Sequence, residues 1–165
     1  MEDADQVRLQ DIFIPERVKL GMAAAEREQA FEELVDLLVE SYNLDCRGEI
    51  LEAIRIRESK ISTGIKKGIA IPHGKANSVK GVLGVIGVSR KGVNYDALDG
   101  EPVHLFFLLV SSPEDAARHL EALKRIAHLL ESQSFYDEML SAANPERANH
   151  ILKNYDEINQ SRQAS

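Results

Sequence analysis

The chain has 165 residues, of which 44% are hydrophobic and 28% charged, a composition that fits one domain with its own core and excludes wholesale disorder. The formal net charge of −7 argues against nucleic acid or an anionic membrane surface as a general partner. The single cysteine excludes an internal disulfide and a cysteine zinc cage.

The two ends of the chain lack the apolar periodicity of a helix or strand. We expect flexible tails over residues 1–8 and 159–165, on either side of one domain over residues 9–158. The first residues are acidic and polar, unlike a secretory signal. The longest apolar stretch, Val103–Val110, is too short to cross a bilayer. The sequence therefore predicts a cytoplasmic protein with no segment inserted into a membrane.

The first third of the chain indicates two amphipathic helices after a short extended piece around Ile12–Leu20. Apolar residues in Glu26–Tyr42 recur at helical spacing. Those expected to face inward are Phe31, Leu34, Val35, Leu38 and Tyr42. A second helix is predicted from about Arg47 to Glu58. Its inward residues are expected to be Ile50, Leu51, Ala53 and Ile54.

Three short apolar runs, bounded by glycine or turn residues, then predict buried strands. The runs are Gly68–Ile71, Val82–Val88 and Val103–Val110, and the turn residues Tyr95–Gly100 separate the last two. Proline cannot donate to a strand ladder, so we expect the first of these strands to end at Pro72.

Helices are predicted for the rest of the chain. Ser112 suits a helix cap and Pro113 the first position of a helix that runs to about Glu131. A shorter helix covers Phe135–Leu140, and Asn144-Pro145 opens the last one. The last helix is expected to bury Ala148, Ile151, Leu152, Tyr155 and Ile158. Because helices surround a few buried strands, the expected fold class is α/β, a single domain in which a sheet is layered with helices.

The segment Arg57–Lys75 contains the groups best suited to chemistry. His73 follows the predicted strand end at Pro72, the edge of an α/β sheet where ligands and reacting groups collect. Its imidazole is a nucleophile available near neutral pH. Seven basic residues against Glu58 alone give residues 54–80 a local net charge of +6.

Small polar groups lie beside this histidine in the sequence. Ser62, Thr63 and Gly64 provide two hydroxyls and a loop amide that can turn toward an anion. A nucleophilic histidine among cations, hydroxyls and glycines suits phosphoryl transfer, because the transferred group is anionic and needs positioning and charge stabilisation. The sequence therefore predicts a phosphoryl site around His73.

Helical geometry points to a second histidine. At about 100° per residue, His119 lies on the stripe of its helix that is expected to be buried, together with Ala116, Leu123, Ile126 and Leu130. His128 lies about 180° away on the solvent face. His119 can therefore approach His73, although a hydrogen-bonded core histidine is the alternative interpretation. His104 and His150 are expected to be structural or exposed.

Several motifs together resemble a known family. They are Arg57-Glu58, the run STGIKKGIAIPHGK, the run YDALDGEPVHLFFLLVSS and then Arg118-His119-Leu120. The chain is similar to the fructose–mannitol (type 2) enzyme IIA of the phosphoenolpyruvate-dependent phosphotransferase system, above all to its nitrogen-regulatory IIA branch, over about residues 9–158. The resemblance implies a mixed β-sheet flanked by helices on both faces. It also implies that His73 is phosphorylated and that Arg57 and His119 flank the phosphoryl group.

One residue departs from the family's pattern. Lys66 stands where members usually have glycine, reading STGIK rather than STGIG. A lysine there reduces the conformational freedom of the loop and adds a cation where a phosphoryl donor would approach. Loop geometry and partner preference are therefore expected to differ from the usual pattern.

The resemblance implies a phosphohistidine carrier that accepts its phosphoryl group on His73 from the histidine-containing phosphocarrier protein. Arg57 would hold the phosphoryl oxygens, His119 would stabilise charge or share a proton, and Ser62, Thr63 and Gly64 would support binding. We favour a regulatory role, in which partner proteins respond to the phosphorylation state. The alternative is a sugar-specific IIA that delivers the group to a separate IIB/IIC transporter.

Other classes of function fit the sequence less well. A binding module with an inactive site is disfavoured by the presence of Arg57, His73 and His119 together. No metal or other cofactor is expected, because the histidines lack metal-ligand spacing, and the glycines near His73 lack the GK[ST] ending of a P-loop. Cys46 has only Arg47 beside it to lower its pKa, so we expect a half-buried structural thiol and no second, cysteine-based carrier domain.

Overall fold

The computed structural model describes residues 7–164, apart from the side chains of residues 65, 66 and 164. Six strands form one mixed sheet in the order β1-β5-β6-β3-β2, with β4 also paired to β6. They are β1 (Val18–Leu20), β2 (Gly64–Lys66), β3 (Ile69–Ala70), β4 (His73–Lys75), β5 (Val82–Val93) and β6 (Val103–Ser111). The two long central strands, β5 and β6, are antiparallel, whereas β3 and β4 both run parallel to β6.

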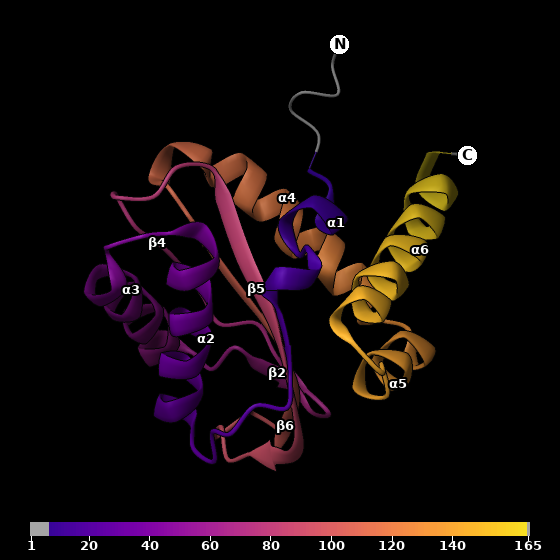
Figure 1. The fold of residues 1–165 in the computed structure, drawn as a ribbon, viewed down its shortest axis with the longest axis horizontal. Helices are drawn as coiled ribbons and strands as arrows, with labels where there is room; N and C mark the ends of the chain where they lie inside the picture. Colours follow the sequence, from indigo (N-terminus) through magenta and orange to yellow (C-terminus); the bar gives the residue numbers. More distant parts are fainter. Residues whose placement is uncertain (1–6, 165) are drawn as a thin grey trace.

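Helices cover both faces of this sheet (Figure 1). On one face lie α2 (Arg27–Tyr42) and α3 (Arg47–Lys60). On the other lie α1 (Leu9–Ile12), α4 (Ala116–Leu129), α5 (Gln133–Leu140) and α6 (Pro145–Ala164). The predicted α/β domain, with a mixed sheet flanked on both faces, is confirmed.

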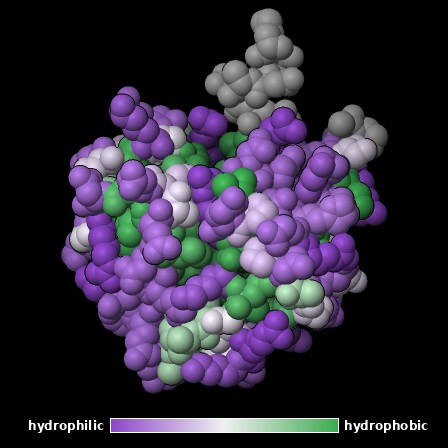
Figure 2. Space-filling view, in the orientation of Figure 1, coloured by the Kyte–Doolittle hydropathy of each residue, from purple (hydrophilic) through white to green (hydrophobic). Residues whose placement is uncertain are grey.

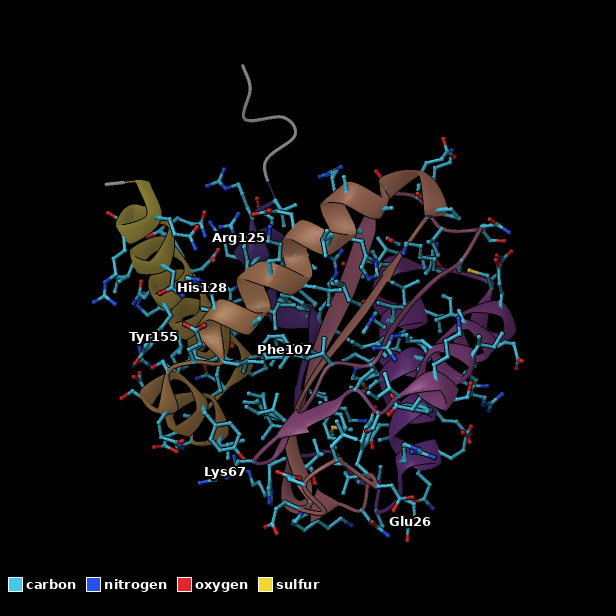
Figure 3. All side chains as sticks on the ribbon, turned by 180° about the vertical axis from the view of Figure 1, so that it is seen from behind. Glu26, Lys67, Phe107, Arg125, His128 and Tyr155 are labelled. Carbon is cyan, nitrogen blue, oxygen red and sulfur yellow. The ribbon has the colours of Figure 1, made fainter. Side chains whose placement is uncertain are left out.

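The alternation of side chains along β6 supplies both cores. Phe106 and Leu108 pack toward α2 and α3, and Phe107 and Leu109 pack toward the opposite helices. Figure 3 shows Phe107 beneath α4. The face seen in Figure 2 is mainly hydrophilic, with hydrophobic residues showing near its centre. Within residues 7–164, no helix combines the length and the apolar character needed to cross a membrane.

The sequence predicts the long elements correctly, but it misses strand β2 and the short helix α1 and misjudges three other strands. Only Val18–Leu20 of the predicted extended piece is a strand, because a 3₁₀ turn that begins at Pro15 precedes it. Strand β5 continues past Val88 to Val93. The predicted strand end at Pro72 is an interruption, since the proline carbonyl still accepts a hydrogen bond from the Leu109 amide at 3.1 Å. Pairing with β6 resumes at His73.

Details of the helices also differ from the predictions. The Ser112 hydroxyl does not cap α4 but donates to the Asp115 carboxylate at 2.6 Å, and a 3₁₀ turn over Pro113–Asp115 precedes the helix. Ala116 and Ile158, both predicted to face inward, are exposed, and Ala116 lines the cavity described below.

The predicted start of the domain at residue 9 coincides with the first residue of α1, whereas no element ends at the predicted limit of residue 158. Helix α6 continues through residue 158 to Ala164, and Val7, placed in the predicted N-terminal tail, is buried in the core. Residues 1–6 of that tail lie outside the described residues. The flexibility of residues 159–164 stays a prediction.

Candidate functional site

A cavity of about 430 Å³ opens where the end of α3, strand β4 and the start of α4 meet. Its described lining comprises Ala53, Ile56, Arg57, Lys60, His73, Gly74, Lys75, Ala116, His119, Leu120 and Leu123. Helix α3 packs directly on β4. A Cβ atom at Gly74 would lie 3.0 Å from the backbone of Ala53, so glycine permits this close approach. The packing brings Arg57 into one cavity with His73.

His73 is held by its own backbone neighbourhood. Its Nδ1 lies 2.7 Å from the carbonyl oxygen of Ile71. Because a carbonyl oxygen can only accept, Nδ1 carries the proton and Nε2 carries the lone pair. Burial lowers the pKa of His73, and the nearby charges of Arg57 and Lys75 lower it further against the opposing effects of the Ile71 hydrogen bond and Glu58. The ring is therefore neutral near pH 7.

His119 lies next to His73 inside the cavity. Its side chain is buried, and the two ring centroids are 5.7 Å apart. The His119 Nδ1 lies 2.7 Å from the hydroxyl oxygen of Ser111. Burial, together with His73 and Lys75, lowers the pKa of His119 to about 4. The prediction that His119 faces inward and approaches His73 is confirmed, and this ring too is neutral near pH 7.

Three cations line the cavity: Arg57, Lys60 and Lys75. The Arg57 guanidinium donates from Nη1 to the carbonyl oxygen of Ile61 at 2.8 Å, which orients it at the end of α3. Among the described lining residues there is no carboxylate. The cavity is therefore suited to an anion that contacts the two histidines.

Two other basic residues of this segment lie outside the described lining of the cavity. Arg55 forms an exposed ion pair with Glu28 of α2. Lys67 lines a separate hollow with His104 and Tyr136, and Figure 3 shows it far from the start of α4. The side chain of Lys66 lies outside the described residues. Of the basic residues behind the local charge of +6, the described lining of the cavity contains Arg57, Lys60 and Lys75.

The sequence predicts that Ser62, Thr63 and Gly64 help to bind the phosphoryl group, but the structure directs their polar groups to other partners. None of the three belongs to the described lining of the cavity. The Thr63 hydroxyl is buried between the Glu58 carboxylate, at 2.6 Å, and the Tyr95 hydroxyl, at 2.8 Å. The Ser62 hydroxyl oxygen accepts from the Gly64 amide at 3.0 Å. A buried carboxylate requires hydrogen-bond donors, and Glu58 draws Thr63 away from the cavity.

The structure adds four residues to this region for which the sequence predicts no specific role: Glu58, Lys60, Tyr95 and Ser111. Glu58 and Lys60 were considered only as charges. The one available signal was that Glu58 is the only acidic residue in a basic segment. Tyr95 contacts Glu58 across 37 positions of the chain, and Ser111 contacts His119 across eight, from a strand to the following helix. No local pattern indicates either contact.

The remaining histidines and the cysteine lie outside the cavity. His128 is exposed and lies 3.2 Å from the side-chain nitrogen of Gln163 on α6, and Figure 3 shows it on the same helix as Arg125. The half-buried His104 bonds the Ser89 carbonyl, and His150 is exposed. Cys46 is half-buried as predicted, and burial with Glu49 and Asp45 raises its pKa. Residues 7–164 contain no group of three or more potential metal ligands.

The family model for the EIIA 2 component of the phosphoenolpyruvate-dependent sugar phosphotransferase system matches residues 11–155. The chain belongs to this family. It is therefore a phosphoryl-transfer component of the phosphotransferase system, and the resemblance seen in the sequence is confirmed.

Relatives of this EIIA domain differ in role. The fructose-specific EIIABC component of Bacillus subtilis is 35% identical over 91% of this chain, which spans only 24% of that protein. The nitrogen regulatory protein IIA-Ntr of Neisseria meningitidis has a TM-score of 0.81 and 30% identity, covering 87% of this chain and 98% of that chain.

A third relative is a solved complex of enzyme IIAMTL with phosphorylated enzyme IIBMTL from Escherichia coli. It matches with a TM-score of 0.71 and 20% identity, covering 84% of this chain and 95% of that chain. At this identity the likeness shows the fold alone.

Proposed function

We propose that this EIIA domain carries its phosphoryl group on Nε2 of His73 and receives it from the histidine-containing phosphocarrier protein in the cytoplasm. The observation that supports this most directly is the 2.7 Å contact from His73 Nδ1 to the Ile71 carbonyl. It directs the lone pair to Nε2, in a cavity lined by three cations.

The transfer is a displacement at phosphorus. The Nε2 lone pair of His73 forms the new N–P bond while the donor's N–P bond breaks, and the donor ring keeps that electron pair. The Nδ1 proton stays on the hydrogen bond to Ile71 throughout. Arg57, Lys60 and Lys75 offset the negative charge of the phosphoryl oxygens. With the Ser111 hydroxyl donating to Nδ1 of His119, the Nε2–H of that ring can donate to a phosphoryl oxygen.

The test is phosphorylation with phosphoenolpyruvate, enzyme I and the phosphocarrier protein. Wild type is expected to form an acid-labile adduct and H73A none. H150A is the matched control, because His150 is exposed on α6 and its removal leaves the cavity intact. An adduct of equal size on H73A, or no adduct on wild type, contradicts the assignment of His73.

We further propose that the phosphorylation state of His73 regulates partner proteins, as in the nitrogen-regulatory branch. The support is that 98% of the N. meningitidis IIA-Ntr chain is matched. Transport is the second candidate function. It is favoured by the fructose-specific relative of B. subtilis.

Capture experiments separate these two roles. Wild type and H73A, each incubated with the phosphorylation mixture, should retain different sets of partners if the role is regulatory. Recovery of a sugar-specific IIB component as the partner, with transfer of the phosphoryl group to it, would favour transport instead.

A further inference from the structure

The buried carboxylate of Glu58 lies next to the proposed phosphoryl site without belonging to its cavity. Glu58 occupies the last turn of α3, directly after Arg57, and only 7% of its surface is exposed. A buried carboxylate is costly unless several donors satisfy it. This raises the question of what Glu58 does for the site.

Three donors meet the Glu58 carboxylate. The Thr63 amide donates to Oε2 at 2.9 Å, and the Thr63 hydroxyl donates to Oε1 at 2.6 Å. The Tyr95 hydroxyl also donates to Oε1, at 3.0 Å. Tyr95 is itself fixed by edge-on packing against Phe31 and Phe106. The carboxylate therefore pins the loop after α3 to a rigid part of the core.

Backbone hydrogen bonds link that loop to both proposed catalytic side chains, directly to Arg57 and through Ile71 to His73. The Ile61 carbonyl accepts from the Arg57 guanidinium at 2.8 Å. The Thr63 carbonyl accepts from the Ile71 amide at 3.0 Å. The Ile71 carbonyl in turn accepts from Nδ1 of His73 at 2.7 Å. One short loop thus orients the guanidinium and the carbonyl that selects the His73 tautomer.

We propose that Glu58 is a positioning residue for phosphoryl transfer, which acts through the 61–63 loop to orient Arg57 and to hold His73 with its lone pair on Nε2. Glu58 touches neither the phosphoryl group nor a reacting atom. The inference rests on the proposed role of His73. It explains why a basic segment contains one acidic residue and why the hydroxyl of Thr63 is turned away from the cavity.

The first test is E58Q, which keeps the shape of the side chain but removes its charge and places an NH₂ group against donors. Two measurements are made at pH 7.5: the tautomer of His73 from its imidazole ¹⁵N shifts, and the rate of phosphoryl transfer. We expect a mixture of tautomers and a rate about tenfold or more below wild type, since hydrogen bonds to charged groups are the strong ones. A folded E58Q with the wild-type tautomer and rate would overturn the proposal.

A second pair of variants serves if E58Q does not fold. T63V replaces the hydroxyl that donates to Glu58 with a methyl group, whereas T63S keeps that hydroxyl and loses the methyl group. T63S should restore the wild-type tautomer and rate, and T63V should not. Equal behaviour of the two variants would overturn the proposal. The tautomer of His73 is measured without any phosphoryl donor. Failure of wild type to form an adduct would therefore refute the proposed function of His73, whereas the effect of Glu58 on the tautomer would be tested independently.

Discussion

The close packing of α3 on β4 predicts opposite effects of two glycine substitutions. Gly74 lies on β4, where an added Cβ would come within 3.0 Å of the backbone carbon and oxygen of Ala53 and 3.1 Å of its Cβ. These atoms cannot rotate away, so G74A forces α3 outward by a few tenths of an ångström. Overpacking of this kind costs about 1–3 kcal/mol. G74A should lower the free energy of unfolding by that amount.

The same displacement acts on the site, because α3 carries Arg57 into the cavity with His73. An error of about 1 Å in the placement of reacting groups can cost about 100-fold in rate. A smaller shift should therefore slow phosphoryl transfer by about three- to tenfold. The stability change is measured by urea unfolding, and the rate by labelling with a limiting amount of the phosphorylated carrier protein.

G48A is the matched control on the same helix. Nothing lies within 4 Å of a Cβ at Gly48, in the first turn of α3. Replacing a helical glycine by alanine should stabilise the protein by up to about 1 kcal/mol and leave transfer unchanged. If G74A unfolds at the same urea concentration as wild type and transfers at the same rate, the packing of α3 does not set the geometry of the site.

Two further predictions concern the charges of the cavity. R57K should slow phosphoryl transfer by about tenfold or more, because a lysine cannot both bond the Ile61 carbonyl and present a planar fork to phosphoryl oxygens. The control R55K, which alters only the exposed ion pair with Glu28, should transfer at the wild-type rate. Equal rates for the two variants would contradict the role of Arg57. The pKa of His119 is about 4 in the folded chain but about 6.5 in the unfolded chain. Between these two pH values the unfolded state therefore binds more protons than the folded state. The free energy of unfolding should fall by about 3 kcal/mol as the pH drops through this range. Urea unfolding of H119Q should show a flatter pH dependence than wild type, and parallel profiles would be evidence against this explanation.

The parts of the fold that follow from local periodicity could be predicted from the sequence. The spacing of Phe31, Leu34, Val35 and Leu38 sufficed to place the buried face of α2. Rotation of about 100° per residue also sufficed to turn His119 inward and His128 outward. Both results depend on geometry within one helix, which residue spacing determines directly.

Features that depend on contacts between distant segments were beyond the sequence. Thr63 was expected to face an anion because it is a hydroxyl near His73, yet Glu58 and Tyr95 compete for that hydroxyl. Tyr95 is 32 positions further along the chain. Likewise, the loss of a donor at Pro72 was visible in the sequence. The ladder bond that its carbonyl still makes with Leu109 depends on the pairing of β4 with β6.

The electrostatics of the cavity fit a group that is received and passed on. Without a phosphoryl group, Arg57, Lys60 and Lys75 line the cavity without a carboxylate among the described lining residues. Burial, with Arg57 and Lys75, lowers the pKa of His73 and so keeps the ring unprotonated near pH 7 with its Nε2 lone pair available. Once a phosphoryl group occupies Nε2, its negative charges offset those same cations, which stabilises the loaded state. A ring of lowered pKa is also a better leaving group. Under the proposed role of His73, the environment that prepares the ring to accept the phosphoryl group therefore equally prepares it to release the group to a partner.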